Sequence, residues 1–411
     1  MEYTIERPLD QVKLNVAKKK RSNLFNWRGQ FTPEFVEYLL TTFGKKNKVV
    51  LDPFAGSGTV INEAAKLGMQ AYGIELNPAS YTMSRFYCLG TLTIDERFKL
   101  INSVKQLLSN QIVPYGNLPV YVSNKDYREA YKNLLGFTKF VYQAANSVEE
   151  KIFLLNLLFF VEKDRRSSIK ESLIKNLQRL KIALLALPSI TENAISIFLN
   201  DARRADRLID QKVDLIVTSP PYINVFNYHQ NYRGLIESIG FDILAVAKSE
   251  VGSNRKNRGN RFRTVVQYSL EMEQTLCSIG NITKKDGKVV LVVGRTSNVR
   301  KVPFSNSEIV TDLISNLDMY QLVQSAERSF TNKFGKTIYE DIIVARKIIH
   351  NQGSSKPAGA DIALKHLKYG LDFANTLDDK TIKADIEDAI NNISSIQPSS
   401  MVNLKAVLPN E

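Results

Sequence analysis

The sequence is poor in the residues that most often bind metals or form disulfide bonds. It has only three histidines and two cysteines in 411 residues. The cysteines, Cys88 and Cys277, form no disulfide or metal-ligand pattern, and the histidines, His229, His350 and His366, show no ligand spacing. We therefore expect no metal site, and the scarcity of cysteine is typical of a reducing, cytoplasmic compartment.

Long hydrophobic runs are absent as well. No apolar stretch approaches the roughly twenty residues that a membrane-spanning helix needs, and the polar, basic N-terminus is unlike a signal peptide. Acidic residues are in the minority: 42 Asp and Glu stand against 55 Lys and Arg, which gives a formal net charge of +13. These properties predict a soluble, intracellular protein without a membrane partner, and the charge favours a polyanionic partner.

What the sequence does contain is an alternation of strand and helix signals. Residues 48–78 give a strand, a glycine-rich loop, a helix and a second strand, which is the pattern of a βαβ unit. Further strands are predicted at 194–201, 213–219, 287–294 and 339–347. This order predicts an α/β fold with a doubly wound, mostly parallel, Rossmann-like sheet, which binds ligands at the carboxyl ends of its strands.

The spacing of these signals divides the chain into four parts. Residues 1–90 hold the first half of the sheet domain, and 91–195 form a mostly helical insertion with helical periodicity at 151–188. Residues 196–348 return to strands, and 349–411 form a weakly helical tail.

The glycine loop "LDPFAGSGT" (51–59) has features of a ligand-binding loop. Gly56 and Gly58 let the backbone approach a ligand, and the following helix start offers free N–H groups. Asp52 would repel a pyrophosphate but can hold a cation, and Glu75, about twenty residues on, can accept both hydroxyls of a ribose. A cationic, ribose-bearing, phosphate-free ligand is S-adenosylmethionine. The alternative is a tight strand–helix turn with a solvated glutamate.

Two further features follow the next predicted strands. Asp201 ends the strand at 194–201, where it can accept a hydrogen bond from an adenine amine or, alternatively, cap a helix. The strand after it stops abruptly in "TSPPY" (218–222), a rigid stretch whose prolines donate no backbone hydrogen bonds. This stretch either presents polar groups to a ligand or is a diproline turn with a packing tyrosine.

With these segments assembled, the chain resembles the DNA amino-methyltransferases, which methylate exocyclic amines of cytosine or adenine. "DPFAGSGT" looks like their cofactor loop, "GIELNP" like their ribose-binding segment and "TSPPY" like their catalytic loop. "FNWRGQFTPEFVEYLL" (25–40) is similar to an additional segment that covers the methionine end of the cofactor. The resemblance implies a methyltransferase sheet with S-adenosylmethionine contacts from Phe31, Thr32, Pro33, Asp52, Pro53, Phe54, Gly56, Gly58, Thr59, Glu75, Asn77 and Asp201.

The resemblance also implies a mechanism for the catalytic loop. The Ser219 hydroxyl and the Pro220 carbonyl would accept the two hydrogens of the target amine, and Pro220 and Pro221 would hold that carbonyl rigidly. Tyr222 would stack on a base flipped out of the duplex. The opposite wall would come from Phe226 or Tyr228, unless these are ordinary core residues. His229 could help to remove the proton, although we favour a surface role for it.

The prediction of the target base depends mainly on Ser219. In this family a serine at the start of the catalytic loop is usual for enzymes that make N4-methylcytosine, and an aspartate is usual for adenine enzymes. Methylation of the cytosine ring carbon is disfavoured, because it needs a nucleophilic cysteine that usually follows a proline, and neither cysteine does. The glycine loop precedes the catalytic loop, contrary to the commonest cytosine pattern, so the place of the target-recognition region stays open. The helical insertion at 91–195 is a candidate for it, and the alternative is a purely structural role of the insertion.

A basic stretch downstream of the catalytic loop is the main candidate for DNA contacts. Residues 251–263 contain Arg255, Lys256, Arg258, Arg261 and Arg263 and no acid. We predict a flexible loop that closes on the phosphates near the flipped base, with a solvated surface loop as the alternative. The basic stretches at 18–22 and 163–166 are weaker candidates.

The expected function is a site-specific DNA cytosine-N4 methyltransferase that acts on double-stranded DNA and associates with the nucleoid. It would be the modification enzyme of a restriction system whose endonuclease is a separate chain. The alternatives are a DNA adenine-N6 methyltransferase, an RNA guanine-N2 methyltransferase and a catalytically silent nucleic-acid-binding module.

Overall fold

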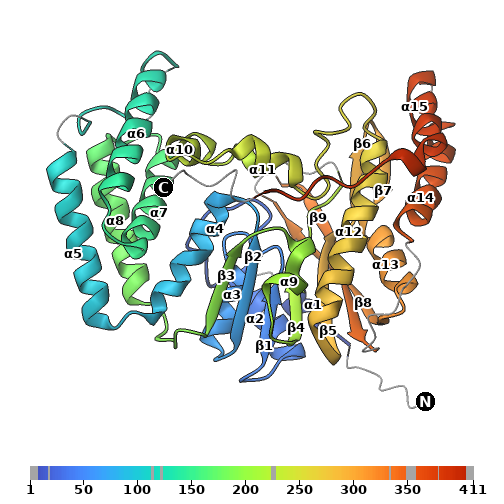
Figure 1. The fold of residues 1–411 in the computed structure, drawn as a ribbon, viewed down its shortest axis with the longest axis horizontal. Coiled ribbons are helices and arrows are strands. Elements are labelled where there is room, and N and C mark those ends of the chain that lie inside the picture. Colours follow the sequence, from blue (N-terminus) through green and yellow to red (C-terminus); the bar gives the residue numbers. More distant parts are fainter. Residues whose placement is uncertain are drawn as a thin grey trace.

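A central sheet organises the chain, and its strand order brings the motifs together (Figure 1). The computed structural model describes residues 8–16, 19–112, 115–120, 124–223, 228–332, 335–348, 358–377 and 379–403. Within these residues the sheet has the order β3-β2-β1-β4-β5-β9-β8. The strands are β1 (Val49–Asp52), β2 (Gln70–Glu75), β3 (Ile195–Leu199), β4 (Val213–Thr218), β5 (Thr283–Gly294), β8 (Tyr320–Thr331) and β9 (Thr337–Lys347).

The first five of these strands are parallel, whereas β9 is antiparallel to both of its neighbours, β5 and β8. Neighbouring residues of a strand face hydrophobic clusters on opposite sides of the sheet. Val50 and Leu215 belong to one cluster, and Leu51 and Ile216 belong to the other. Strands buried on both faces explain the near-continuous apolar runs in the sequence. The predicted doubly wound, mostly parallel α/β fold is confirmed.

Helices cover both faces of this sheet. In chain order, the helices of the described residues are α1 (Gln11–Asn15), α2 (Pro33–Phe43), α3 (Thr59–Lys66), α4 (Pro78–Arg85), α5 (Ile94–Gln111), α6 (Asn124–Ala144), α7 (Val148–Lys163), α8 (Ile169–Leu185), α9 (Ala205–Leu208), α10 (Arg233–Ser238), α11 (Ile243–Ser249), α12 (Arg263–Ile282), α13 (Asn306–Asn316), α14 (Gly359–Ala374) and α15 (Lys380–Asn391). Helices α2 and α3 contribute to the first cluster, and α12, α13 and α14 to the second. Within the described residues, no helix has both the length and the apolar character that crossing a membrane requires.

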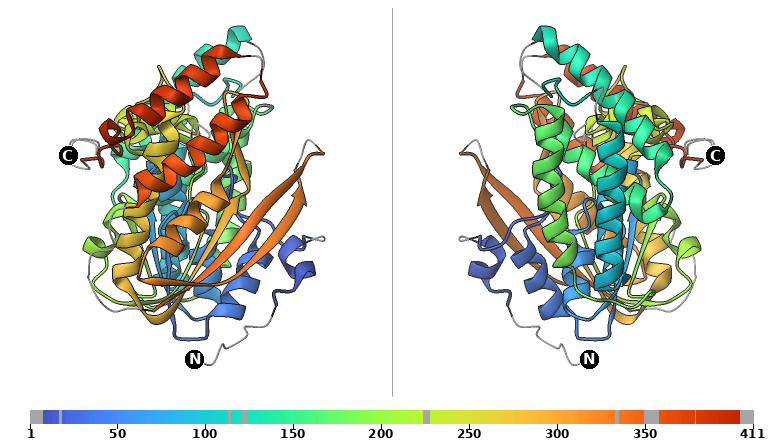
Figure 2. Two further views of the ribbon diagram at one scale, coloured as in Figure 1. Left: turned by 90° about the vertical axis from the view of Figure 1, so that its right-hand side faces the viewer. Right: turned by 90° about the vertical axis from the view of Figure 1, so that its left-hand side faces the viewer.

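The edge hairpin β8–β9 was only half predicted. The sequence indicated β9, but β8 was missed because its polar stretch "YQLVQSAERSFT" has only two buried residues, Tyr320 and Arg328. A small hairpin of β6 (Thr296–Val299) and β7 (Val302–Ser305) was missed as well. Figure 2 shows β8 and β9 (orange) reaching out beside the N-terminal helices α1 and α2 (dark blue).

Helices α5 to α8 lie between β2 and β3 in the chain and stand at the β3 end of the molecule (Figure 1). The stretch at 151–188, for which helical periodicity was noted, forms two helices, because Ser168 begins a new helix through a capping box with Glu171. Helix α7 is buried almost all round, which accounts for its run of apolar residues.

A buried arginine, Arg97, ties the two ends of this helical insertion together. Its guanidinium group donates hydrogen bonds to five backbone carbonyls and, among the described residues, contacts no carboxylate. The carbonyls of Gly90 and Leu92 precede α5, whereas those of Leu184, Leu187 and Pro188 lie at the end of α8 or just after it. Arg97 therefore joins the segment by which the chain enters the insertion to the segment by which it returns to the sheet domain.

The C-terminal region is more ordered than the weakly helical tail that the sequence predicted. Helices α14 and α15 pack on α12 and against each other, and the chain then crosses the carboxyl edge of the sheet (Figure 1). Ser399 and Ser400 accept hydrogen bonds through their backbone carbonyls from Arg203 and Ser249. Residues 349–357 of the predicted tail lie outside the described residues.

Candidate active site

The predicted motifs meet at the carboxyl ends of four neighbouring strands. Asp52 ends β1, Glu75 ends β2, Asp201 follows β3 and Thr218 ends β4, and the sheet order places these strands side by side. The hydroxyl of Thr218 donates a hydrogen bond of 2.6 Å to Asp52 Oδ1. This bond joins the start of the catalytic loop directly to the start of the glycine loop.

The glycine loop is held by the two acids that flank it. Gly56 N donates to Glu75 Oε2 at 2.7 Å, and Phe54 N donates to Asp52 Oδ1 at 3.1 Å. Gly58 has φ +86°, and a Cβ there would lie 2.9 Å from the Cα of Ser84, so only glycine fits. Pro53 and Thr59 are buried within this turn, and the Thr59 hydroxyl donates to Asn23.

Both acids titrate near neutrality in this environment. Burial raises the pKa of Asp52 to about 7, with a further contribution from the neighbouring charge of Glu75. Burial likewise raises the pKa of Glu75 to about 7, although hydrogen bonds from the backbone of Asn77 and Gly56 oppose this. A cation bound beside these carboxylates would favour their ionised forms.

The segment at 25–34 lies directly against the glycine loop. Trp27 is so close to Gly56 that a Cβ at Gly56 would lie 3.4 Å from its ring, and Ser57 Oγ donates to Gln30 Oε1 at 2.7 Å. Phe31 and Pro33 are buried, whereas Thr32 precedes α2 without making a side-chain capping bond. The structure therefore brings the predicted additional segment and the glycine loop together.

The catalytic loop packs against the end of β5. Ser219 and Pro221 are half-buried and Pro220 is buried. Tyr222 packs its ring on Gly294 at the end of β5, where a Cβ would lie 2.6 Å from Tyr222 Cε2. Phe226, one predicted wall of the base pocket, lies outside the described residues.

Asn306 fixes the end of this loop, a role that sequence reasoning missed. Its Oδ1 accepts a hydrogen bond of 3.0 Å from Ile223 N, and its Nδ2 donates to the Gly294 carbonyl at 3.0 Å. Asn306 begins α13, more than eighty residues from the loop, and no local pattern links the two positions.

The favoured surface role for His229 is wrong, because its side chain is buried. Its Nε2 contacts the guanidinium group of Arg255, and its Nδ1 lies 3.1 Å from Glu250 Oε2. Because arginine only donates, Nε2 must accept, and Nδ1–H then donates to Glu250. The lone pair that would take a proton from the target amine is therefore already engaged.

The basic stretch at 251–263, predicted to be a flexible loop, makes several contacts within the protein. Arg255 contacts His229, Lys256 Nζ donates to the Gln397 carbonyl at 3.0 Å, and Arg263 pairs with Asp388 of α15 at 2.9 Å. Among the described residues, exposed Arg258 and Arg261 have no such partner. Their contact with DNA remains a prediction.

The two weaker basic candidates also make intramolecular contacts. Arg21 of the stretch at 18–22 pairs with Glu63 and Glu37. Lys163 of the stretch at 163–166 lies 4.4 Å from the centre of the Tyr232 ring. Lys18 lies outside the described residues.

The contacts of Asp201 match its alternative role, which is to cap a helix. It accepts from the backbone N–H of Arg203, and the Arg203 side chain donates to both of its carboxylate oxygens at 2.9 and 2.6 Å. Arg203 is itself buried. A bond from an adenine amine to Asp201 remains a prediction, and it would have to share a carboxylate that is already paired.

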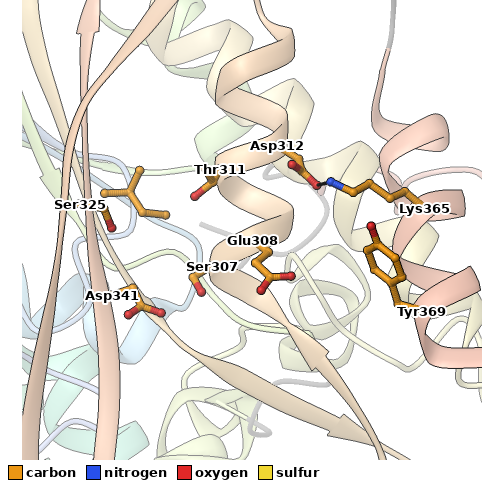
Figure 3. A pocket seen from close by; sticks show the side chains of 9 residues that line it. Ser307, Glu308, Thr311, Asp312, Ser325, Asp341, Lys365 and Tyr369 are labelled. Carbon is orange, nitrogen blue, oxygen red and sulfur yellow. Dashed lines mark hydrogen bonds and ion pairs between the residues drawn. The ribbon is translucent and has the colours of Figure 1, made fainter. Parts of the chain in front are cut away.

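A separate polar cavity of about 320 Å³ lies between α13, β8, β9 and α14 (Figure 3). It is lined by Ser307, Glu308, Thr311, Asp312, Ser325, Asp341, Ile343, Lys365 and Tyr369, none of which was predicted as a site residue. Across it, Asp312 pairs with Lys365 (Figure 3). In the described part of the chain, no three His, Cys, Asp or Glu side chains are grouped closely enough to hold a metal ion.

The strand order and the loops at this sheet edge define the class: the fold is that of the Rossmann-like methyltransferases. TrmN from Thermus thermophilus is 14% identical, with 78% of this chain and 50% of that chain covered and a TM-score of 0.33. A putative methyltransferase from Streptococcus mutans in complex with SAH is 6% identical, with 77% and 98% covered and a TM-score of 0.31. The class rests on the strand order and not on these weak likenesses.

Sequence comparison shows a similarity to DNA methylases. Residues 7–85 match the family model described as DNA methylase. The Type II methyltransferase M.BsoBI of Geobacillus stearothermophilus is 23% identical, over 54% of this chain and 54% of that protein. The Type II methyltransferase M.MjaII of Methanocaldococcus jannaschii is 35% identical over 13% of this chain and 10% of that protein. The chain thus matches about half the length of one relative and a tenth of the other, and it is similar to the DNA amino-methyltransferases.

S-adenosylmethionine, the methyl donor of this family, fits the groups at the sheet edge. The carboxylates of Asp52 and Glu75 suit a cationic ligand that carries a ribose. Two predicted contact residues also offer unused polar atoms: Thr32 Oγ1 and Asn77 Nδ2 are buried and make no hydrogen bond within the described residues.

Proposed function

We propose that the chain methylates the N4 amine of cytosine in double-stranded DNA. The observation that carries this proposal is the hydrogen bond between Thr218 and Asp52, because it sets the catalytic loop against the glycine loop. A methyl donor held at the glycine loop would then adjoin the groups that hold an amine. Ser219, the next residue, favours cytosine through the family's usual pairing of loop and base.

The chemistry of the chain's own residues follows from the loop. S-adenosylmethionine, when bound, supplies an electrophilic methyl group. The Ser219 hydroxyl and the Pro220 carbonyl accept the two hydrogens of the target amine, which localises the nitrogen lone pair for attack. The prolines and the bond from Ile223 to Asn306 fix these acceptors in advance, so that little reorganisation is needed.

The substrate and partner belong to the same proposal. Arg258 and Arg261 are exposed on the loop beside the catalytic segment and would contact DNA phosphates. The two curated relatives are named as Type II methyltransferases, which supports a role in a restriction system with a separate endonuclease.

Nucleoside analysis tests the target base. Purified chain, radiolabelled S-adenosylmethionine and unmethylated DNA are incubated, the DNA is digested, and the modified nucleoside is identified by mass spectrometry. We expect N4-methylcytosine. N6-methyladenine alone would establish the adenine alternative, preferential labelling of tRNA the guanine-N2 alternative, and DNA binding without any transfer the silent module.

Affinity for the cofactor is expected to rise with pH. Asp52 and Glu75, both with a pKa of about 7, are mainly protonated at pH 6 and mainly ionised at pH 8. If binding the sulfonium needs an ionised group, the dissociation constant of S-adenosylmethionine should fall about tenfold over this range. Isothermal titration calorimetry measures this effect.

The product S-adenosylhomocysteine, whose sulfur is uncharged, is the matched control ligand and should show a smaller change. Asp52→Asn should reduce the difference between the two ligands. A dissociation constant for S-adenosylmethionine that stays constant from pH 6 to pH 8, in chain that remains folded, contradicts the assignment of these acids.

A further inference from the structure

The edge hairpin carries a buried ion pair beside the catalytic loop. Arg328 of β8 stands directly opposite Glu340 of β9, and Glu340 stands opposite Gly294, the last residue of β5. Arg328 Nε lies 3.5 Å from Glu340 Oε2, and the two side chains are only 5% and 13% exposed. The hairpin thus places the opposite charges of Arg328 and Glu340 beside the end of β5, where the Tyr222 ring packs.

Tyr222 contacts the other oxygen of the same carboxylate. Its hydroxyl donates to Glu340 Oε1 at 3.3 Å, while its ring lies on Gly294. The Glu340 carboxylate therefore connects Arg328 on one side with the catalytic loop on the other. Two different strands and one loop are needed to build this arrangement.

The ion pair is poorly suited to a purely structural role. Within the described residues, Arg328 Nε and Nη1 make no hydrogen bond, and the guanidinium carbon lies 3.8 Å from the centre of the Phe35 ring. Burial lowers the pKa of Arg328 and raises the pKa of Glu340, so both charged forms are held at a cost. A well-packed apolar pair at such a site is often as stable or more stable.

We propose that the Arg328–Glu340 pair positions Tyr222 and, through it, the catalytic loop. Glu340 accepts a hydrogen bond from the Tyr222 hydroxyl and holds the ring against Gly294, and Arg328 holds the carboxylate toward the loop. This inference rests on the proposed methyl transfer. It assigns to the edge hairpin a part in setting the geometry of the reaction.

A double-mutant cycle tests the connection between Glu340 and Tyr222. Glu340→Gln, Tyr222→Phe and the double variant are assayed with tritiated S-adenosylmethionine and unmethylated, PCR-amplified genomic DNA. We expect each single change to lower kcat about 10- to 100-fold through misplacement, with KM for the cofactor within about twofold of wild type. The double variant should be no slower than the slower single variant, because both changes act on the same contact.

The matched control is Glu327→Gln, which removes an exposed carboxylate of the same hairpin that pairs with Arg295 and not with Tyr222. It should leave kcat unchanged. The variant with both Arg328→Met and Glu340→Gln should keep or raise the melting temperature while kcat falls, a result that a structural role does not give.

The outcomes distinguish a failure of the proposed positioning of Tyr222 from a failure of the proposed methyl transfer. Wild-type kcat in Glu340→Gln, or losses that multiply in the double variant, would overturn the positioning of Tyr222. A wild-type chain that transfers no methyl group to DNA or RNA would instead defeat the proposed function and the inference that rests on it.

Discussion

Ser219→Ala is expected to lower kcat for methyl transfer to DNA about 100-fold, the loss typical of removing one preorganised hydrogen-bonding group. The hydroxyl is one of two acceptors proposed for the target amine, and without it the nitrogen lone pair stays delocalised in the ring. The cofactor groups lie on other loops, at Asp52 and Glu75. The dissociation constant of S-adenosylmethionine should therefore remain unchanged.

Single-turnover assays with labelled cofactor and unmethylated DNA measure the rate of this step. Ser395→Ala, at an exposed serine of the C-terminal region, is the matched control and should react like wild type. Tyr222→Ala should also reduce kcat, because it removes the aromatic face proposed for the flipped base. A Ser219→Ala variant that transfers methyl groups at the wild-type rate would contradict the proposed role of the loop.

Arg97→Leu is expected to lower the free energy of unfolding by about 3 kcal/mol or more, since it leaves several buried carbonyls without donors. In the wild-type protein the guanidinium group donates hydrogen bonds to five carbonyls at the two ends of the insertion. Leucine fills much of the space but donates nothing. Urea denaturation followed by circular dichroism measures the change.

Lys99→Leu is the control for Arg97, because it removes an exposed positive charge from the same helix. It should change stability by less than about 0.5 kcal/mol. Arg97→Lys should recover part of the loss, because an ammonium group still donates three hydrogen bonds. An Arg97→Leu variant as stable as wild type would show that the carbonyls find other partners.

The glycine loop and the positions of most of the main strands could be predicted because their signals are local. A buried parallel strand is a short apolar run, and the turn that follows it needs glycine where φ is positive, as at Gly56 and Gly58. Strand β8 could not be predicted in this way, because an edge strand with polar residues resembles a loop.

The contacts that hold the catalytic loop join residues far apart in the chain. Asn306 reaches Ile223, and Glu340 reaches Tyr222, across separations of 83 and 118 residues. The same holds for the basic stretch, in which Lys256 is held by a carbonyl of residue 397. A charge run in a sequence does not reveal which of its members already have partners.

The sequence by itself determined the fold class of the protein and predicted the chemistry of its loops, because the glycine turn, the acid that ends β2 and the diproline stretch are each complete within a few residues. Only the tertiary structure decided which groups support that chemistry. It buried His229 between Glu250 and Arg255, anchored the basic stretch and placed the Arg328–Glu340 pair against Tyr222. The physical reason is that burial and ion pairing depend on neighbours in space, which the strand order of the sheet supplies.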